Sequence, residues 1–287
     1  MKYTKNVLKV ALLLVALLLF FVPALQPLLC ADFTCGYDNV FHLWRAVQVD
    51  HLWAQGVLYS RWAPDMAHGF GFPLFNFMPP GTAIGAALLH RLGLSWPVAL
   101  NGLFALGMIA GGLFMFCLAR DLFGTYAGMV AAVGYVYAPF LAYDVFNRGS
   151  LSESVAWAFP PLILWALRRW SLFRERRFLI AGTLGLAALM LSHHPFGFLF
   201  APLLALWVLL MGYLARDWRV LWRGVLLGGL GLGLVAFFWL PPLLERDFVQ
   251  TERLLGTWVF DYHYNFLSLG HVLALPRAAD PYLINDW

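Results

Sequence analysis

Long hydrophobic runs, separated by short polar segments, dominate the pattern along the chain. A helix that crosses the hydrocarbon core of a bilayer, about 30 Å thick, needs roughly 20 consecutive apolar residues. Seven blocks reach or approach this length, at residues 7–29, 97–118, 125–145, 152–167, 178–193, 196–214 and 220–240. The pattern therefore predicts an all-α fold, a polytopic transmembrane helical bundle with about seven spans.

A shorter apolar stretch, 79–90, decides the direction of every later helix. If it does not cross, the N-terminus, Arg120 and the loops 168–177 and 215–223 share one side, with 12 of the 19 basic residues and only three acidic residues. If it crosses, only eight basic residues lie on that side. Basic residues concentrate in cytoplasmic loops. We therefore expect a cytoplasmic N-terminus, with 79–90 as a juxtamembrane helix at the outer interface that opens on two prolines.

This topology divides the chain into a transmembrane domain, 1–245, and an extracytoplasmic tail, 246–287. The first outer loop, 30–78, is also extracytoplasmic, and the location is the plasma (inner) membrane. Composition agrees, because 62% of the residues are hydrophobic and 12% are charged, about half the charged fraction of a soluble domain. The N-terminal apolar run is too long for a cleaved signal peptide and lacks its cleavage site, so it is predicted to be a retained anchor.

Two further features bear on partners and redox chemistry. The basic residues lie in short loops beside apolar blocks and form no patch interleaved with aromatic residues, so no nucleic-acid partner is indicated. Cys30 and Cys35 lie close together on the outer side, where they could form a disulfide or remain two free thiols. The sequence leaves both states open.

The first outer loop carries the most informative pattern. Its segment 39–55 is predicted to be an amphipathic helix, with Asp38 as its N-cap. Asp38, His42 and Arg45 follow each other at i, i+4 and i+7 and therefore share one face. Apolar residues take the opposite face: Val40, Phe41, Trp44 and Val47. A solvated polar stripe on an interfacial helix explains this pattern as well as a functional site does.

Three motifs follow one another in this region. Asp-x-x-x-His-x-x-Arg-Ala spans 38–46, Gly-x-Leu-Tyr-x-Arg-Trp-x-Pro-Asp spans 56–65, and Gly-x-Gly-x-Pro-Leu-Phe-x-Phe-x-Pro-Pro spans 69–80. In this order they resemble a bacterial and archaeal family named 6-pyruvoyl-tetrahydropterin synthase-related membrane protein, of the GT-C glycosyltransferase superfamily. The specific match covers about residues 36–80, and the helix layout extends the similarity to most of the chain. Family members are longer, so this sequence is similar to their N-terminal part.

More distantly, the layout is similar to that of lipid-linked aminoarabinose transferases and protein mannosyltransferases. These have a first helix, a long outer loop with an aspartate, a juxtamembrane helix that opens on Pro-Pro, and a cytoplasmic turn like Arg-Asp-Leu-Phe-Gly at 120–124. The resemblance implies transfer of a sugar from a polyprenyl-phosphate donor to an unidentified acceptor on the outer face. It also implies that Asp38 is the catalytic residue, a general base that takes the proton of the acceptor hydroxyl.

Other polar residues on the predicted outer side are candidates for substrate binding. A phosphate leaving group calls for cations, and arginine suits its oxygens, which makes Arg45, Arg61 and Arg148 candidates; each could equally contact a headgroup or a surface acid. The remaining candidates are His42, Glu153, His193 and His194. Glu153 could instead only favour a helix N-terminus, and the histidine pair could be an ordinary interface turn.

A metal ion is a further expectation of the resemblance. Asp38, Glu153 and His193 could together hold Mg²⁺ or Mn²⁺, although hard divalent ions prefer oxygen ligands. A different class of function also fits the sequence: a non-catalytic membrane protein, such as a transporter subunit or an assembly factor for envelope polysaccharide. A transporter should carry ionisable residues near mid-membrane. Here the spans are nearly free of charge in their middles, which favours chemistry at the outer surface.

Overall fold

The computed structural model describes residues 2–34, 36–250, 261–264, 266 and 268–270. Within these residues the regular secondary structure is helical, with loops between the helices and an isolated bridge between Ala63 and Phe72. It divides into two compact units, Met1–Trp239 and Leu240–Trp287, compared with a predicted boundary after 245. The described part of the second unit contains the short 3₁₀ turns Arg246–Phe248 and Tyr262–Tyr264.

Four helical segments are long and apolar enough to cross a membrane, counted over the described residues. The first is the end of α1 (Lys2–Leu25) with the 3₁₀ turn η1 (Gln26–Leu29). The others are α5 (Trp96–Phe123), the series α6 (Thr125–Val136), α7 (Pro139–Tyr143) and η2 (Asp144–Arg148), and α11 (His194–Ala215). A fifth would combine α12 (Arg219–Leu234) with α13 (Ala236–Leu244), which are bent by 78°. Their length and apolar composition indicate a membrane protein.

The predicted blocks 152–167 and 178–193 form helices that fall short of this length. The first is broken into α8 (Leu151–Ala156) and α9 (Phe159–Phe173). Pro160 and Pro161 follow the break, and proline has no N–H to continue the hydrogen bonding of a preceding helix. The second block forms α10 (Arg176–Ser192), which has 17 residues. The structure therefore gives four or five candidate spans where the sequence predicts seven.

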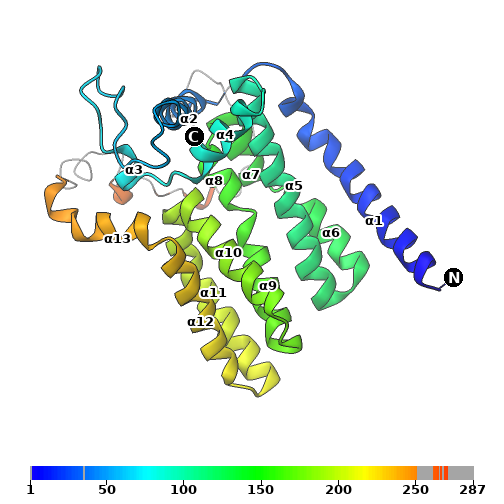
Figure 1. Cartoon of the computed structure of the whole chain (residues 1–287). Helices are drawn as coiled ribbons and strands as arrows, with labels where there is room; N and C mark the ends of the chain where they lie inside the picture. Colours follow the sequence, from blue (N-terminus) through cyan, green and yellow to red (C-terminus); the bar gives the residue numbers. More distant parts are fainter. Residues whose placement is uncertain (1, 35, 251–260, 265, 267, 271–287) are drawn as a thin grey trace. The chain divides into compact units, whose positions relative to one another are not determined.

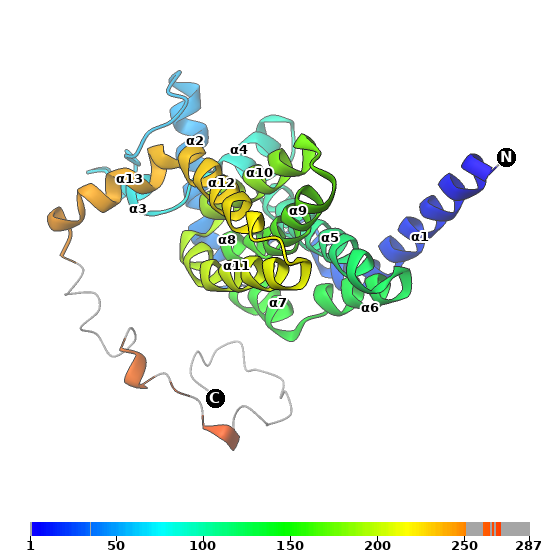
Figure 2. The ribbon, with the colours of Figure 1, turned by 90° about the horizontal axis from the view of Figure 1, so that it is seen from below.

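The helices of the first unit pack around two apolar cores. α5 packs against α6, α8 and α9, while α10 packs against α9 and α12. Seen from below in Figure 2, α5 and α6 lie on one side of α9, and α11 and α12 on the other. One core is centred on Phe104 and Met108 of α5, and the other on Ile163, Leu189 and Leu227. Many large apolar side chains outside these cores are exposed, as a lipid-facing surface requires.

The polar features separate to the two ends of this bundle. In Figure 1 the α5–α6, α9–α10 and α11–α12 turns lie at the same end as the start of α1. Two acids there bind the arginines of neighbouring turns. Asp121 contacts Arg168 and Arg169, and Asp217 contacts Arg174 and Arg223. The basic segments thus gather at one end, which is the arrangement that the predicted topology requires.

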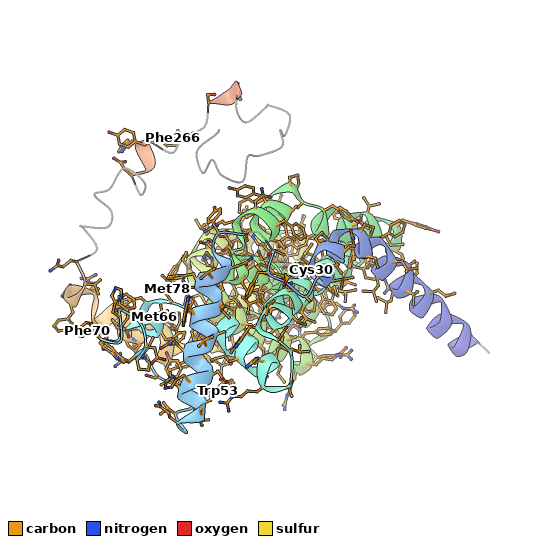
Figure 3. All side chains as sticks on the ribbon, turned by 90° about the horizontal axis from the view of Figure 1, so that it is seen from above. Cys30, Trp53, Met66, Phe70, Met78 and Phe266 are labelled. Carbon is orange, nitrogen blue, oxygen red and sulfur yellow. The ribbon has the colours of Figure 1, made fainter. Side chains whose placement is uncertain are left out.

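The opposite end carries α2 (Asn39–Ala54), α3 (Leu74–Phe77) and α4 (Gly81–Arg91). α2 covers all but the last residue of the predicted helix 39–55, and α4 begins two residues later and ends one residue later than the predicted helix 79–90. With 11 residues, α4 is too short to cross a bilayer and packs between α2 and α5. Viewed from above in Figure 3, α2 lies across this end of the bundle, with Trp53 near its C-terminus and Met66 and Phe70 in the loop beyond it.

The structure describes one of the two outer cysteines. Cys30 is an exposed free thiol whose sulfur contacts the carbonyl oxygen of Pro27 at 3.1 Å. Cys35 lies outside the described residues.

Candidate functional site

α2 buries its polar face and exposes its apolar face. Its buried residues include the polar Asn39, His42, Arg45 and Gln48, whereas Val40, Phe41 and Trp44 are exposed. This orientation rules out the simpler interpretation of a solvated polar stripe. It is the orientation expected of a helix that turns its apolar side to lipid and its polar side to a protein interior.

Asp38 begins this polar face and occupies the N-cap position of α2, as predicted. The predicted side-chain cap is wrong, because its carboxylate makes no hydrogen bond to the first turn of α2. Instead Oδ2 lies 3.5 Å from Nε of Arg148, and the Asp38 amide donates to the Arg148 carbonyl at 2.9 Å. Backbone and side chain of Asp38 are thus both fixed by the segment that joins η2 to α8.

Two glycines allow this close approach of the loops before α2 and after η2. A Cβ atom on Gly36 would collide with the backbone of Gly149. Gly149 has φ +70°, in the left-handed region, and a Cβ there would meet Oδ1 of Asn39 at 2.6 Å. Since only glycine has no Cβ, these positions bring Asp38 to Arg148.

Arg148 lies at the centre of a group that we call the Arg148 cluster: Asp38, Asp144, Arg148, Glu153 and Ser154. Nη1 of Arg148 is 2.6 Å from Oε2 of Glu153 and 3.4 Å from Oδ1 of Asp144. The other oxygen of Asp144 accepts a hydrogen bond from Oγ of Ser154 at 2.8 Å. One guanidinium therefore lies against three carboxylates, all at the α2 end of the bundle.

Asp144 is the member of the cluster that the sequence analysis missed. It is fully buried, and it precedes Arg148 by one helical turn. An acid and a base at i and i+4 on a helix face each other, so the spacing of Asp144 and Arg148 could have indicated their contact. In the sequence, however, Asp144 looks like the end of the predicted span 125–145, separate from the loop that contains Arg148.

His42 links α2 to the start of α8. Its buried Nε2 accepts a hydrogen bond from the Leu151 amide at 3.1 Å. Burial first, and then the positive charges of Arg45 and Arg148, lower the pKa of His42 to about 3. The imidazole is therefore neutral, with its proton on Nδ1. Its contact is structural, since the acceptor nitrogen already holds a backbone group.

The environment of Asp38 suits a proton acceptor. Burial raises the pKa of its carboxyl above the ordinary value, against the opposing effect of Arg148 and Arg45, and Glu153 raises it further. A carboxylate with a raised pKa is a stronger base than an ordinary surface aspartate. Asp38 is half-buried, so a small molecule can reach it.

The remaining predicted residues lie in two other settings. Arg61 donates to Oδ1 of Asn76 at 3.1 Å, within the outer loop. His193 ends α10, and its Nδ1 accepts from the Phe196 amide at 3.3 Å, which caps α11. His194 is partly buried and packs edge-on against aromatic rings, those of Phe198 and Phe238.

The donor set does not fit a metal ion. Among the residues that the structure describes, no three His, Cys, Asp or Glu side chains are placed to hold one. Asp38 and Glu153, two of the three predicted ligands, are instead joined by the guanidinium of Arg148. A resident cation already balances the charge that Mg²⁺ or Mn²⁺ would balance.

A small depression beside α2 has a cavity volume of about 10 Å³, which is room for about one water molecule. It is lined by Val49 and Leu52 of α2, by residues of the outer loop such as Tyr59, and by Ile84 of α4.

Comparison with known proteins gives no assignment. No protein-family model, no curated protein and no solved structure matches this chain. The resemblance to GT-C enzymes therefore rests on the sequence motifs, and the functional argument rests on the geometry of the Arg148 cluster.

Proposed function

We propose that this chain is a membrane glycosyltransferase, or the N-terminal part of one, that moves a sugar from a polyprenyl-phosphate donor to an acceptor at the extracytoplasmic face. One observation carries the proposal. Asp38, the aspartate that the family resemblance assigns as base, is a half-buried carboxylate held by Arg148 at the end of the bundle opposite the basic loops.

The reaction needs one proton acceptor and one leaving group. The acceptor hydroxyl gives its proton to the Asp38 carboxylate while its oxygen forms a bond to the anomeric carbon. The bond between that carbon and the donor phosphate oxygen breaks, and the lipid phosphate leaves with the electron pair. A single displacement that inverts the anomeric centre requires no covalent enzyme intermediate.

Arg148 is the positioning residue for this base. Its guanidinium contacts Asp38 while Glu153 and Asp144 hold it from the other side. This arrangement favours the ionised form of Asp38 and fixes its orientation. Without this partner, burial and the charge of Glu153 would raise the pKa of Asp38 further.

The lipid side of the reaction is supported by the surroundings of α2. The exposed apolar residues of α2, among them Phe41 and Trp44, support a position of this helix at the membrane interface, within reach of a lipid. The finer topology that we propose has seven spans, with α8–α9, α10 and α12–α13 crossing in addition to the four longer segments.

The test is transfer of labelled sugar in proteoliposomes from a set of polyprenyl-phosphate sugars. Wild type, Asp38→Asn and Asp50→Asn are compared. Asp50 is a matched control, because it lies on the same helix but binds Arg91 of α4 instead of the Arg148 cluster. Wild type and Asp50→Asn should transfer sugar, and Asp38→Asn should be inserted and folded but inactive.

Transfer by Asp38→Asn at the wild-type rate would contradict the proposal, because it would remove Asp38 as the base. Absence of transfer by wild type with every donor would leave two possibilities: an incomplete enzyme, or the alternative class, a non-catalytic membrane protein such as a transporter subunit or an assembly factor for envelope polysaccharide. The same assay on a full-length relative separates the two, since only an incomplete enzyme gains transfer when the missing part is present.

A further inference from the structure

The turn between α11 and α12 carries two arginines that pair with no acid of the described residues. Arg216 and Arg219 are exposed, and neither guanidinium makes an ion pair within that part of the chain. The acid between them, Asp217, is committed to other groups. Its Oδ2 lies 3.5 Å from Nη2 of Arg174 and 3.3 Å from Nη2 of Arg223. Its Oδ1 accepts a hydrogen bond from the Arg219 amide at 3.1 Å.

An excess of positive charge extends over this end of the bundle. The end of α5 and the segments 168–177 and 215–223 together hold nine arginines and three acids. In Figure 1 the turns that contain them lie at the same end. Such an excess attracts anions to the surface, and salt weakens this attraction.

The face of α12 that begins at Arg219 has the polarity of a phospholipid. Positions i, i+3, i+7 and i+11 lie on one face of a helix. From Arg219 they are Trp222, which is 75% accessible, and then Leu226 and Leu230, which are also exposed. The leucines lie about 10–17 Å along the helix axis from Arg219. The cation at the helix end, the tryptophan one turn inside and the leucines beyond match the headgroup, interface and hydrocarbon of one leaflet.

The last turns of α11 repeat this order in the opposite chain direction. Tyr213 is 71% accessible and precedes Arg216, the C-cap residue of α11, by three residues. Leu203, Leu206 and Leu210 continue the face of Tyr213 and are exposed as well. Because α11 and α12 pack against each other, two exposed apolar faces lead to the arginines of a single turn.

We propose that Arg216 and Arg219 bind the phosphate group of an anionic phospholipid whose acyl chains lie along the exposed faces of α11 and α12. A guanidinium offers several N–H donors in one plane and suits phosphate oxygens. Basic groups between membrane helices on the cytoplasmic side are a recurrent site for anionic headgroups. This site lies at the end of the bundle away from the Arg148 cluster, and it does not depend on a transferase activity.

The test is binding of single lipid molecules to the purified full chain in detergent, counted by native mass spectrometry. The probes are phosphatidylglycerol, phosphatidylcholine with the same acyl chains, and inorganic phosphate. Wild type is compared with Arg216→Gln, Arg219→Gln and Arg177→Gln. Arg177 is the matched control, because it is exposed in the neighbouring α9–α10 segment but already pairs with Glu175 at 2.6 Å.

Wild type and Arg177→Gln should bind the first phosphatidylglycerol more tightly than phosphatidylcholine. Arg216→Gln and Arg219→Gln should each lose about fivefold in affinity for phosphatidylglycerol, as expected for one arginine near a headgroup. Phosphatidylcholine should bind all variants alike. Arg219→Lys should keep most of the preference, because it retains the charge and loses only the planar set of donors.

A second measurement separates lipid binding from a structural role. Without added lipid, Arg219→Gln and Arg177→Gln should melt at the same temperature, because exposed charges contribute little to stability. A lower melting temperature for Arg219→Gln would show that this side chain supports the fold, and would overturn the proposal.

The binding results can overturn the proposal in three further ways. Equal losses in Arg177→Gln and Arg219→Gln would mean that only the net charge of this end matters. Equal affinity of wild type for phosphatidylglycerol and phosphatidylcholine would remove the headgroup site. Tight binding of inorganic phosphate would show a site for a free anion instead of a lipid.

Discussion

Arg148 shows how much of the candidate chemistry depends on one side chain. It ends the π-helical turn η2, and its guanidinium contacts Asp38, Asp144 and Glu153. Each of these acids would repel the others if the cation were absent. The half-buried Asp38 then differs from an ordinary surface aspartate in two respects: its orientation is fixed, and its pKa is raised by burial.

The pH dependence of sugar transfer tests this assignment. Asp38 must be ionised to accept a proton, so activity should fall as the pH drops through its raised pKa, above the usual range of about 4. Glu153 raises that pKa, so Glu153→Gln should lower it and leave Arg148 more available to Asp38. The acidic limb of the kcat/KM profile should therefore move to lower pH in Glu153→Gln. An unchanged limb, or a shift to higher pH, would show that a different group titrates.

At the scale of single elements, α2 illustrates what a sequence pattern can and cannot say. Its length and its two faces follow from the spacing of Asp38, His42 and Arg45 against Phe41 and Trp44. Periodicity alone does not tell which face is buried, because a helix at a membrane interface can expose its apolar side. In the structure, contacts with residues far away in the sequence show which face is buried. One of them is the hydrogen bond from the Leu151 amide to Nε2 of His42.

Breaks within the helices were harder to predict than the helices themselves. The block 152–167 has the hydrophobicity of a span, but the Pro160-Pro161 pair divides it into α8 and α9. The effect of the prolines could have been foreseen from their missing N–H groups. The bend of 78° between α12 and α13 follows glycines in the last turn of α12, Gly231 and Gly233, which weaken a helix.

The junction between α2 and the η2–α8 segment makes a prediction about stability. Gly149→Ala should destabilise the chain by about 1–3 kcal/mol, because alanine is strained at φ +70° and its Cβ would meet Asn39. Gly134→Ala is the control, since a Cβ at that helical position meets nothing within 4 Å. Thermal unfolding in one detergent measures both. Equal melting temperatures for the two variants would contradict the described packing of Gly36 on Gly149.

At the scale of the whole first unit, the charge pattern was the most useful guide. It placed the loops around Arg120, 168–177 and 215–223 on one side, and the structure gathers these loops at one end. The number of spans was harder to predict than the side of each loop. The sequence predicts seven, whereas the lengths and composition of the described helices support four or five. Asp144 escaped notice because an acid at the end of an apolar block looks like the edge of a span until its partners are known.

The predicted orientation of the bundle can be tested by thiol labelling. Starting from a variant with Cys30, Cys35 and Cys117 replaced by serine, Phe70→Cys and Arg177→Cys are introduced singly. Both positions are strongly exposed; Phe70 lies in the outer loop between α2 and α3, and Arg177 lies in the first turn of α10. In intact cells a membrane-impermeant reagent should label Phe70→Cys only. Labelling of Arg177→Cys instead would invert the topology and place the Arg148 cluster on the cytoplasmic side.

The most direct test of the central claim is the rate of sugar transfer by Asp38→Asn relative to wild type and Asp50→Asn. Asparagine keeps the shape of Asp38 but cannot take a proton, and loss of a general base costs about 10²–10⁴ in rate. We predict a loss of at least about 100-fold in Asp38→Asn, with Asp50→Asn close to wild type. An Asp38→Asn variant as active as wild type would contradict the claim that this carboxylate performs the chemistry.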